Sequence, residues 1–266
     1  MLRVGLLGVF RITNVDPRCW SELGVGGRSF ASYLFAYPDQ PHRRERLSYL
    51  FWPDLDEDHA RSALNSAVWR IRKIFACVPE SAGDQALKTT GPEIRLQHAD
   101  WLDVDALALQ RAADIVARNP ASLADRVVLD GVIAALHRYH GPFLDGDDGD
   151  WILEEREKLH STFVRTSIQA VCQLGGRRRY SDAIDLARLA LKFDPYREEL
   201  VRLFLGLLTL NEQRVGAIRH YDSWSKSLAK DLSIAPLPAT RALFEEIKAI
   251  DSDGEFQALQ ARLFGS

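Results

Sequence analysis

The sequence has little of the chemistry that marks secreted, membrane-bound or disulfide-stabilised proteins. Its three cysteines, Cys19, Cys77 and Cys172, are odd in number and far apart, so a disulfide framework is not expected and a reduced compartment is favoured. No apolar run approaches the roughly 18 residues that a membrane-spanning helix needs. Arg3 and Arg11 interrupt the apolar N-terminus, which argues against a signal peptide. We therefore expect a cytoplasmic protein without a membrane partner.

Motifs of catalysis and metal binding are also missing. The chain has neither a G-x-S-x-G nucleophile motif nor an H-E-x-x-H zinc motif. The acidic segment that begins at Asp145 lacks the sixth-position glycine and the twelfth-position glutamate of a calcium-binding loop. His137 and His140 have no further His or Cys pair to complete a metal site, and the glycine-rich segment 24–27 lacks the Lys-Ser/Thr of a phosphate loop. We predict a protein that is not an enzyme and that uses no metal or cofactor.

A general excess of positive charge is absent as well. The formal net charge is -3 at pH 7, and the apolar content of 46% with 27% charged residues is that of a folded protein. The charge is unevenly placed, because residues 61–95 hold six basic and three acidic side chains. Screening cuts off charges beyond about 10 Å at 0.1 M salt. A local basic face can therefore bind phosphate, although the net charge predicts weak non-specific affinity for nucleic acid.

What the sequence does contain is a helix-turn-helix pattern. A first helix is predicted over 42–52 and ends at Pro53, because proline cannot continue a helix. An acid-rich turn follows, in which Asp54 or Asp56 can cap a second helix over 56–75. This second helix places apolar residues at spacings of three and four on one stripe, which indicates a buried face.

The opposite, polar stripe of the second helix carries candidate DNA contacts. Arg and Asn side chains can form bidentate hydrogen bonds with guanine and adenine edges in the major groove, and basic residues near the helix end suit phosphates. The alternative is the solvated face of an ordinary amphipathic helix; the preceding helix, the breaker and the following hairpin favour DNA. The candidates on this helix are Arg61, Asn65, Ser66, Trp69, Arg70, Arg72 and Lys73.

Residues 87–97 predict a hairpin around Gly91-Pro92. Beside a recognition helix such a hairpin can act as a wing that reaches the minor groove or the backbone. For any one residue the alternative is an edge hairpin that completes a small sheet. The wing candidates are Lys88, Thr89, Thr90 and Arg95.

The remaining segments are predicted from periodicity. Residues 2–12 alternate between apolar and polar, which indicates one half-buried strand, and a helix is expected over 28–37. From Trp101 onward we expect helices alone, among them 103–118 and 123–140.

The C-terminal half shows a repeat signal. Ala183, Ala190 and Pro195 fit the small-small-proline positions of a tetratricopeptide repeat, whose period is 34 residues. The same period leads to Ala217, a good match, and to Trp224, a poor one. The pattern favours a stack of helix pairs with one good and one degenerate unit, followed by an extra helix over 238–249.

Together these patterns predict a fold that is mainly α with a small β component. An N-terminal winged helix-turn-helix domain is expected over 1–98, and an all-α, tetratricopeptide-like helical repeat domain over 99–250. A C-terminal tail over 251–266 can form a further helix.

Five segments of the chain, in this order, resemble the Streptomyces antibiotic regulatory protein (SARP) type of transcriptional activator. The segments are 2–12, 43–75, 141–159, 180–210 and 220–247. The resemblance implies a response-regulator-type winged helix followed by a bacterial transcriptional activator domain. It also implies promoter binding at direct repeats and recruitment of RNA polymerase. By position, the second helix of the helix-turn-helix corresponds to the family's recognition helix, and residues 88–95 correspond to its wing.

Two functions stay open from the sequence. In the first, the chain is a DNA-binding activator, with promoter DNA and RNA polymerase as partners and a second protomer or a regulatory protein as further ones. In the second, the chain is a helical-repeat interaction scaffold whose winged helix no longer binds DNA. An open face shared by the basic side chains would favour the first, and their pairing with the acids at 54–58 would favour the second. A small ligand in the concave face of the repeats is compatible with either function, but no residue identifies one.

Overall fold

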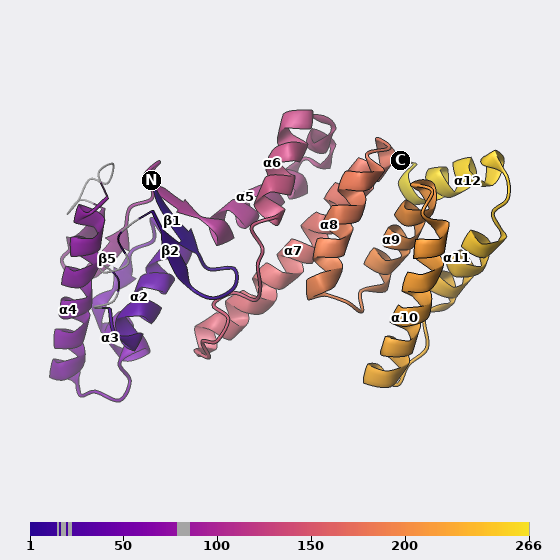
Figure 1. Cartoon of the computed structure of the whole chain (residues 1–266). Coiled ribbons are helices and arrows are strands. Elements are labelled where there is room, and N and C mark those ends of the chain that lie inside the picture. The colour runs from indigo at the N-terminus through magenta and orange to yellow at the C-terminus, as the bar shows by residue number, and fades with distance from the viewer. Residues whose placement is uncertain (15, 17–19, 21–22, 79–85, 266) are drawn as a thin grey trace. The chain divides into compact units, whose positions relative to one another are not determined.

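The computed structural model describes residues 1–14, 16, 20, 23–78 and 86–265. Figure 1 shows the order of the elements along the chain. The chain divides into two compact units, of which the first contains Met1–Ala108 and His140–Arg156 and the second contains Leu109–Tyr139 and Glu157–Ser266. The segment around residue 150 therefore packs with the N-terminal unit, although part of the second unit precedes it in sequence.

Two small sheets belong to the first unit. One has the strand order β2-β1-β6, in which β1 pairs antiparallel with β2 and parallel with β6. The other has the order β3-β5-β4 and is antiparallel throughout. The strands are β1 Leu2–Gly5, β2 Arg11–Thr13, β3 His42–Arg43, β4 Leu87–Thr90, β5 Glu93–Leu96 and β6 Leu102–Val104.

The N-terminal segment forms two strands, so the prediction of one strand over 2–12 was wrong. The chain turns between β1 and β2, where Gly8 has a φ of +113°, which glycine adopts at little cost. The N–H groups of Leu6 and Leu7 donate to the buried carboxylate of Asp105, at 2.8 and 3.2 Å. This contact is distant in sequence, and local alternation therefore does not reveal it.

Strand β6 corrects the prediction that strands stop at Trp101. Val104 lies opposite Val4 in the parallel pairing with β1, and the N–H group of Leu2 donates to the carbonyl of Trp101 at 2.6 Å. A strand of three residues is too short to give a pattern of alternation.

Three helices of the first unit pack into the winged-helix arrangement, and their bounds shift slightly from the predicted ones. They are α2 Val25–Ala36, α3 Arg44–Phe51 and α4 Glu57–Ala76. The helix predicted from residue 42 begins at Arg44, because His42 and Arg43 pair with Ile94 and Glu93 of β5. Residues 79–85, between α4 and β4, lie outside the described residues.

The second unit is built from helices. Helices α5 Asp105–Arg118 and α7 Asp150–Gly176 contribute residues to both units. The others are α6 Arg126–Leu136, α8 Tyr180–Phe193, α9 Glu198–Leu210, α10 Arg214–Leu232, α11 Pro238–Ala249 and α12 Asp253–Phe264. Successive helices from α8 to α11 pack on one another, and α12 packs on α9.

The helix predicted over 123–140 is shorter and begins later. A 3-10 turn covers Pro120–Ala124, and α6 begins only at Arg126, where the side chain of Asp125 accepts hydrogen bonds from two backbone N–H groups. The cap fixes the start of the helix.

The predicted repeat positions lie where helices pack closely. Ala183, Ala190 and Ala217 are all fully buried, as small residues between packed helices should be. The poor match, Trp224, fills its position with an indole whose Nε1 donates to the carbonyl of Pro195 at 3.0 Å. At this position of the repeat a buried aromatic side chain, whose N–H group has a hydrogen-bond partner, therefore stands in place of a small residue.

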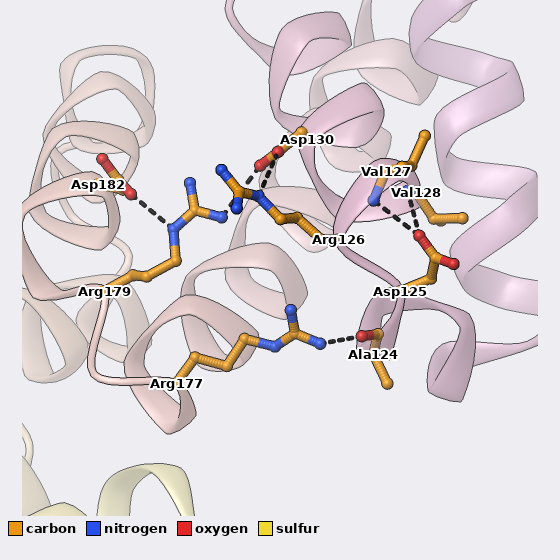
Figure 2. Close-up of polar contacts among 9 residues, drawn as sticks. All are labelled: Ala124, Asp125, Arg126, Val127, Val128, Asp130, Arg177, Arg179 and Asp182. Atoms are coloured by element: carbon orange, nitrogen blue, oxygen red, sulfur yellow. Dashed lines mark hydrogen bonds and ion pairs between the residues drawn. The ribbon is translucent and has the colours of Figure 1, made fainter.

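Arginines between α7 and α8 hold the 3-10 turn and α6 in the second unit (Figure 2). Arg177 donates to the carbonyl of Ala124, and Arg179 bonds Asp130 at 3.0 Å and Asp182 at 2.7 Å. The hydrogen bond from Arg179 lowers the pKa of the Asp130 carboxyl.

Candidate nucleic-acid interface

Helix α4 is fixed by its cap and by its apolar stripe. The side chain of Asp56 accepts from the N–H group of His59 at 3.0 Å, and the acids of the first turn suit the positive end of the helix dipole. Leu64, Ile71 and Phe75 have at most 1% of their surface exposed. The predicted register of this helix is therefore confirmed, and its opposite side is presented to solvent.

An aromatic cluster supports α2 and α3 beneath the interface. The rings of Tyr33 and Phe51 lie 5.5 Å apart, and both contact Trp151 at the start of α7, with centroid distances of 5.1 and 6.4 Å. The hydroxyl of Tyr37 donates to Glu155 at 2.9 Å. Residues near 150 therefore stabilise the helix-turn-helix, which no sequence pattern indicated.

Most of the predicted contacts on α4 lie together on its outer face. Arg61, Asn65, Ser66, Trp69, Arg70 and Lys73 are all exposed. Asn65, Ser66, Trp69 and Arg70 line one shallow hollow together with Ser62.

Trp69 and Lys73 form a pair on this face. The ammonium of Lys73 lies 4.1 Å from the centroid of the Trp69 ring, which is a cation–π contact. Even so, 55% of Trp69 is exposed. A large aromatic side chain in this position offers a surface on which a partner can pack.

Arg72, for which a phosphate contact is predicted, makes two hydrogen bonds to the first strand of the wing. Its Nη2 donates to the carbonyl of Leu87 at 3.1 Å and to the hydroxyl of Thr89 at 2.9 Å. The guanidinium thus connects α4 to the first strand of the wing. Two of the predicted contacts, Arg72 and Thr89, are engaged with each other.

Arg61 is partly neutralised by acids of its own helix. Its guanidinium lies 2.5 Å from a carboxylate oxygen of Glu57 and 3.6 Å from one of Asp58. The sequence leaves open whether the basic side chains share one open face or pair with the acids at 54–58, and the structure shows some of each. Arg61 pairs with these acids, Arg72 holds the wing, and Arg70 has no ion-pair partner among the described residues.

The hairpin of β4 and β5 is confirmed, and it brings two cations together. Lys88 lies directly opposite Arg95, and Thr90 lies opposite Glu93; Lys88, Thr90 and Arg95 are exposed. Like charges that face each other across strands disfavour the pairing. An anion bound beside Lys88 and Arg95, such as a phosphate group, would relieve this repulsion.

Sequence reasoning missed one residue that contacts the candidate interface. Arg44, the first residue of α3, donates from Nη2 to the side-chain oxygen of Asn65. The sequence does show that Arg44 lies in the basic start of the first predicted helix. It does not show which turn of α4 this start faces.

Within the part of the chain that the structure describes, His, Cys, Asp and Glu side chains do not gather in groups of three or more that could hold a metal ion. Among the same residues, no helix combines the length and apolar character that crossing a bilayer requires.

Comparison with known families decides the class of the protein. A family described as bacterial transcriptional activator domain matches residues 104–248, which is more than half of the 266-residue chain. The chain belongs to this family. Bacterial transcriptional activator domains occur in transcriptional regulators rather than in a class of enzymes, and the predicted relationship to SARP-type activators is confirmed.

Curated relatives of the chain include the transcriptional regulatory protein EmbR of Mycobacterium tuberculosis and that of Mycobacterium bovis. Each is 26% identical over 260 residues, which cover 92% of this chain and 63% of the relative. The chain thus spans less than two thirds of the length of these relatives.

A solved structure of Mycobacterium tuberculosis EmbR, in complex with a low affinity phosphopeptide, has the same fold. The TM-score is 0.68 at 22% identity, over 99% of this chain and 69% of that chain. The predicted fold class, a winged helix followed by a helical repeat domain, is confirmed.

Proposed function

We propose that the chain is a sequence-specific DNA-binding regulator of transcription. It acts as an activator that binds promoter repeats and recruits RNA polymerase. In this proposal residues 1–98 form the DNA-binding domain, residues 99–250 form the activator domain, and residues 251–266 form a C-terminal tail. The similarity to EmbR, a transcriptional regulatory protein, supports the regulatory role.

The observation that carries the proposal is the open polar face of α4. Asn65, Ser66, Trp69 and Arg70 are exposed and line one hollow. An α-helix fits the major groove, where Asn and Arg can hydrogen-bond base edges, and the exposed ring of Trp69 can pack on a thymine methyl group or a sugar.

Cations beside this face supply phosphate contacts. Lys73 lies in the last turn of α4, and Lys88 and Arg95 lie opposite each other on the wing. Contacts with phosphates orient a protein on the duplex without selecting a sequence. The base contacts from α4 then provide the specificity.

Two observations favour the alternative, an interaction scaffold without DNA binding. Arg61 is paired with Glu57 and Asp58, and the guanidinium of Arg72 is engaged with the wing. The EmbR structure contains a phosphopeptide, which supports a protein partner as well. We place such a partner, or a second protomer, at the helical repeats.

Selection from a pool of random duplexes tests the proposal without knowledge of the operator. The full chain should enrich a defined sequence, and Arg70→Ala should weaken binding to that sequence by about 1–3 kcal/mol. Arg219→Ala is the matched control, because Arg219 is an exposed arginine on α10 outside the interface. Equal affinities of Arg70→Ala and the wild type would contradict the site, and failure to enrich any sequence would favour the scaffold.

Glu57→Gln gives a second, opposite test. The substitution removes one anion from the start of α4 and releases Arg61 from its shorter ion pair. Tighter binding to the selected duplex is therefore expected. Weaker binding would mean that Glu57 serves to orient Arg61 rather than to neutralise it.

A further inference from the structure

Asn65 on α4 is not free to act alone, because Arg44 of α3 holds its amide. Nη2 of Arg44 donates to Oδ1 of Asn65. Arg44 is itself positioned by its backbone: its N–H group donates to the carbonyl of Pro92 at 2.8 Å, and its carbonyl accepts from the hydroxyl of Ser48 at 2.9 Å. The wing and α3 therefore fix the start of the arginine side chain, and its end orients the asparagine.

This contact changes what Asn65 can recognise. An asparagine that binds adenine in the major groove uses both ends of its amide: the oxygen accepts from the adenine N6 amino group and the nitrogen donates to N7. In this protein one of the two lone pairs of the oxygen accepts from the Arg44 guanidinium, so donors flank the oxygen on that side. The NH₂ group on the other side only donates.

The guanidinium of Arg44 adds donors beside this NH₂ group. An arginine has five N–H donors and no acceptor, and the structure shows one of the nitrogens of Arg44 engaged with Asn65. Guanine presents two adjacent acceptors in the major groove, N7 and O6, whereas adenine presents a donor beside its N7. The donors of the pair match guanine and leave the adenine amino group facing another donor.

We propose that Arg44 and Asn65 act as one unit that selects guanine over adenine in the major groove. This inference rests on the proposed DNA binding and names the base that this part of α4 recognises. Arg44 orients the amide of Asn65 and contributes donors of its own. Removal of Arg44 frees both lone pairs of the Asn65 oxygen and takes away the competing guanidinium donors, so the same position should then prefer adenine.

The test compares sequences selected from random duplexes by the full chain and its variants. Asn65→Ala identifies the base pair concerned, because it removes the preference at that position. The wild type should prefer guanine there, and Arg44→Ala should prefer adenine. A good bidentate contact discriminates by about 1–3 kcal/mol, so the ratio of affinities for the two bases should change by about 5- to 150-fold.

Arg46→Ala is the matched control, since Arg46 is an exposed arginine on the same helix and should leave the selected base unchanged. A wild type that selects adenine, thymine or cytosine at the position lost in Asn65→Ala overturns the inference. This outcome is read from the wild type, so it can be obtained even if Arg44→Ala fails to fold. Selection of the same base by the wild type and Arg44→Ala overturns it too. A chain that enriches no sequence at all refutes the proposed function instead, so the two failures are distinguishable.

Discussion

Replacement of Arg72 by alanine separates a structural role from a role in DNA contact. The side chain is half-buried and connects α4 to the wing through Leu87 and Thr89. If this connection is its main role, Arg72→Ala should destabilise the first unit. Thr89→Val removes only the hydrogen bond to the hydroxyl, and the effects of the two substitutions should therefore not add.

The size of the effect follows from the two hydrogen bonds. A hydrogen bond to a charged group contributes about 1.5–3 kcal/mol; solvent around Thr89 weakens one bond, so we expect a loss of about 2 kcal/mol for Arg72→Ala. With an m-value of about 2 kcal/mol per molar urea, the unfolding midpoint should fall by about 1 M. The coupling between Arg72 and Thr89 in a double-mutant cycle should be at least about 0.5 kcal/mol.

Urea titration followed by tryptophan fluorescence provides these values, and hydrogen exchange of the β4 amides localises them. An unchanged midpoint together with a large loss of DNA affinity would refute the reasoning, because Arg72 would then serve the ligand and not the wing. Faster exchange in β4 with unchanged exchange in α9 would support it.

Three further predictions concern the rest of the chain. Leu64→Ala should cost about 2–5 kcal/mol because Leu64 is fully buried, and Leu64→Asp should abolish the cooperative melt of the first unit; a retained melt would show that the register of α4 is wrong. The pKa of the Asp130 carboxyl is lowered, so its ion pair stabilises the fold above the ordinary carboxyl pKa, and this stabilisation is lost as pH falls below about 4. Below that pH the difference in urea midpoint between wild type and Asp130→Asn should therefore shrink. A constant difference from pH 7 to 3 would contradict this prediction. Burial raises the pKa of Cys172 to about 11, so iodoacetamide at pH 8 should modify the exposed Cys77 faster, as peptide mass spectrometry can measure; equal rates would contradict the burial.

The elements that the sequence predicts well are those with strong local signals. Helix α4 has a cap and an apolar stripe that repeats over its whole length, and the hairpin has Gly91 at a φ of +57° between two short strands. Both features depend on residues within about ten positions of each other. Pattern reasoning is therefore sufficient for them.

The elements that the sequence does not predict depend on distant contacts. The buried carboxylate of Asp105 accepts from Leu6 and Leu7 and so separates β1 from β2. Trp151 completes an aromatic cluster with Tyr33 and Phe51. No periodicity within a window of the sequence indicates either contact.

The candidate site shows the same limit. The polar stripe of α4 locates its exposed residues, because exposure follows from helix geometry. It does not show that Arg61 is paired with Glu57 or that Asn65 is held by Arg44. These side-chain partners decide which groups remain available to a ligand, and they depend on how the helices and the wing pack.

The salt dependence of DNA binding tests the central claim most directly. The dissociation constant of the full chain for its selected duplex should be measured between 50 and 200 mM NaCl. Three phosphate contacts, from Lys73, Lys88 and Arg95, predict a slope of about -2.7 in a plot of the log of the association constant against log salt concentration, since each contact contributes about -0.9. A slope near zero, or no binding at the lowest salt, would contradict the account.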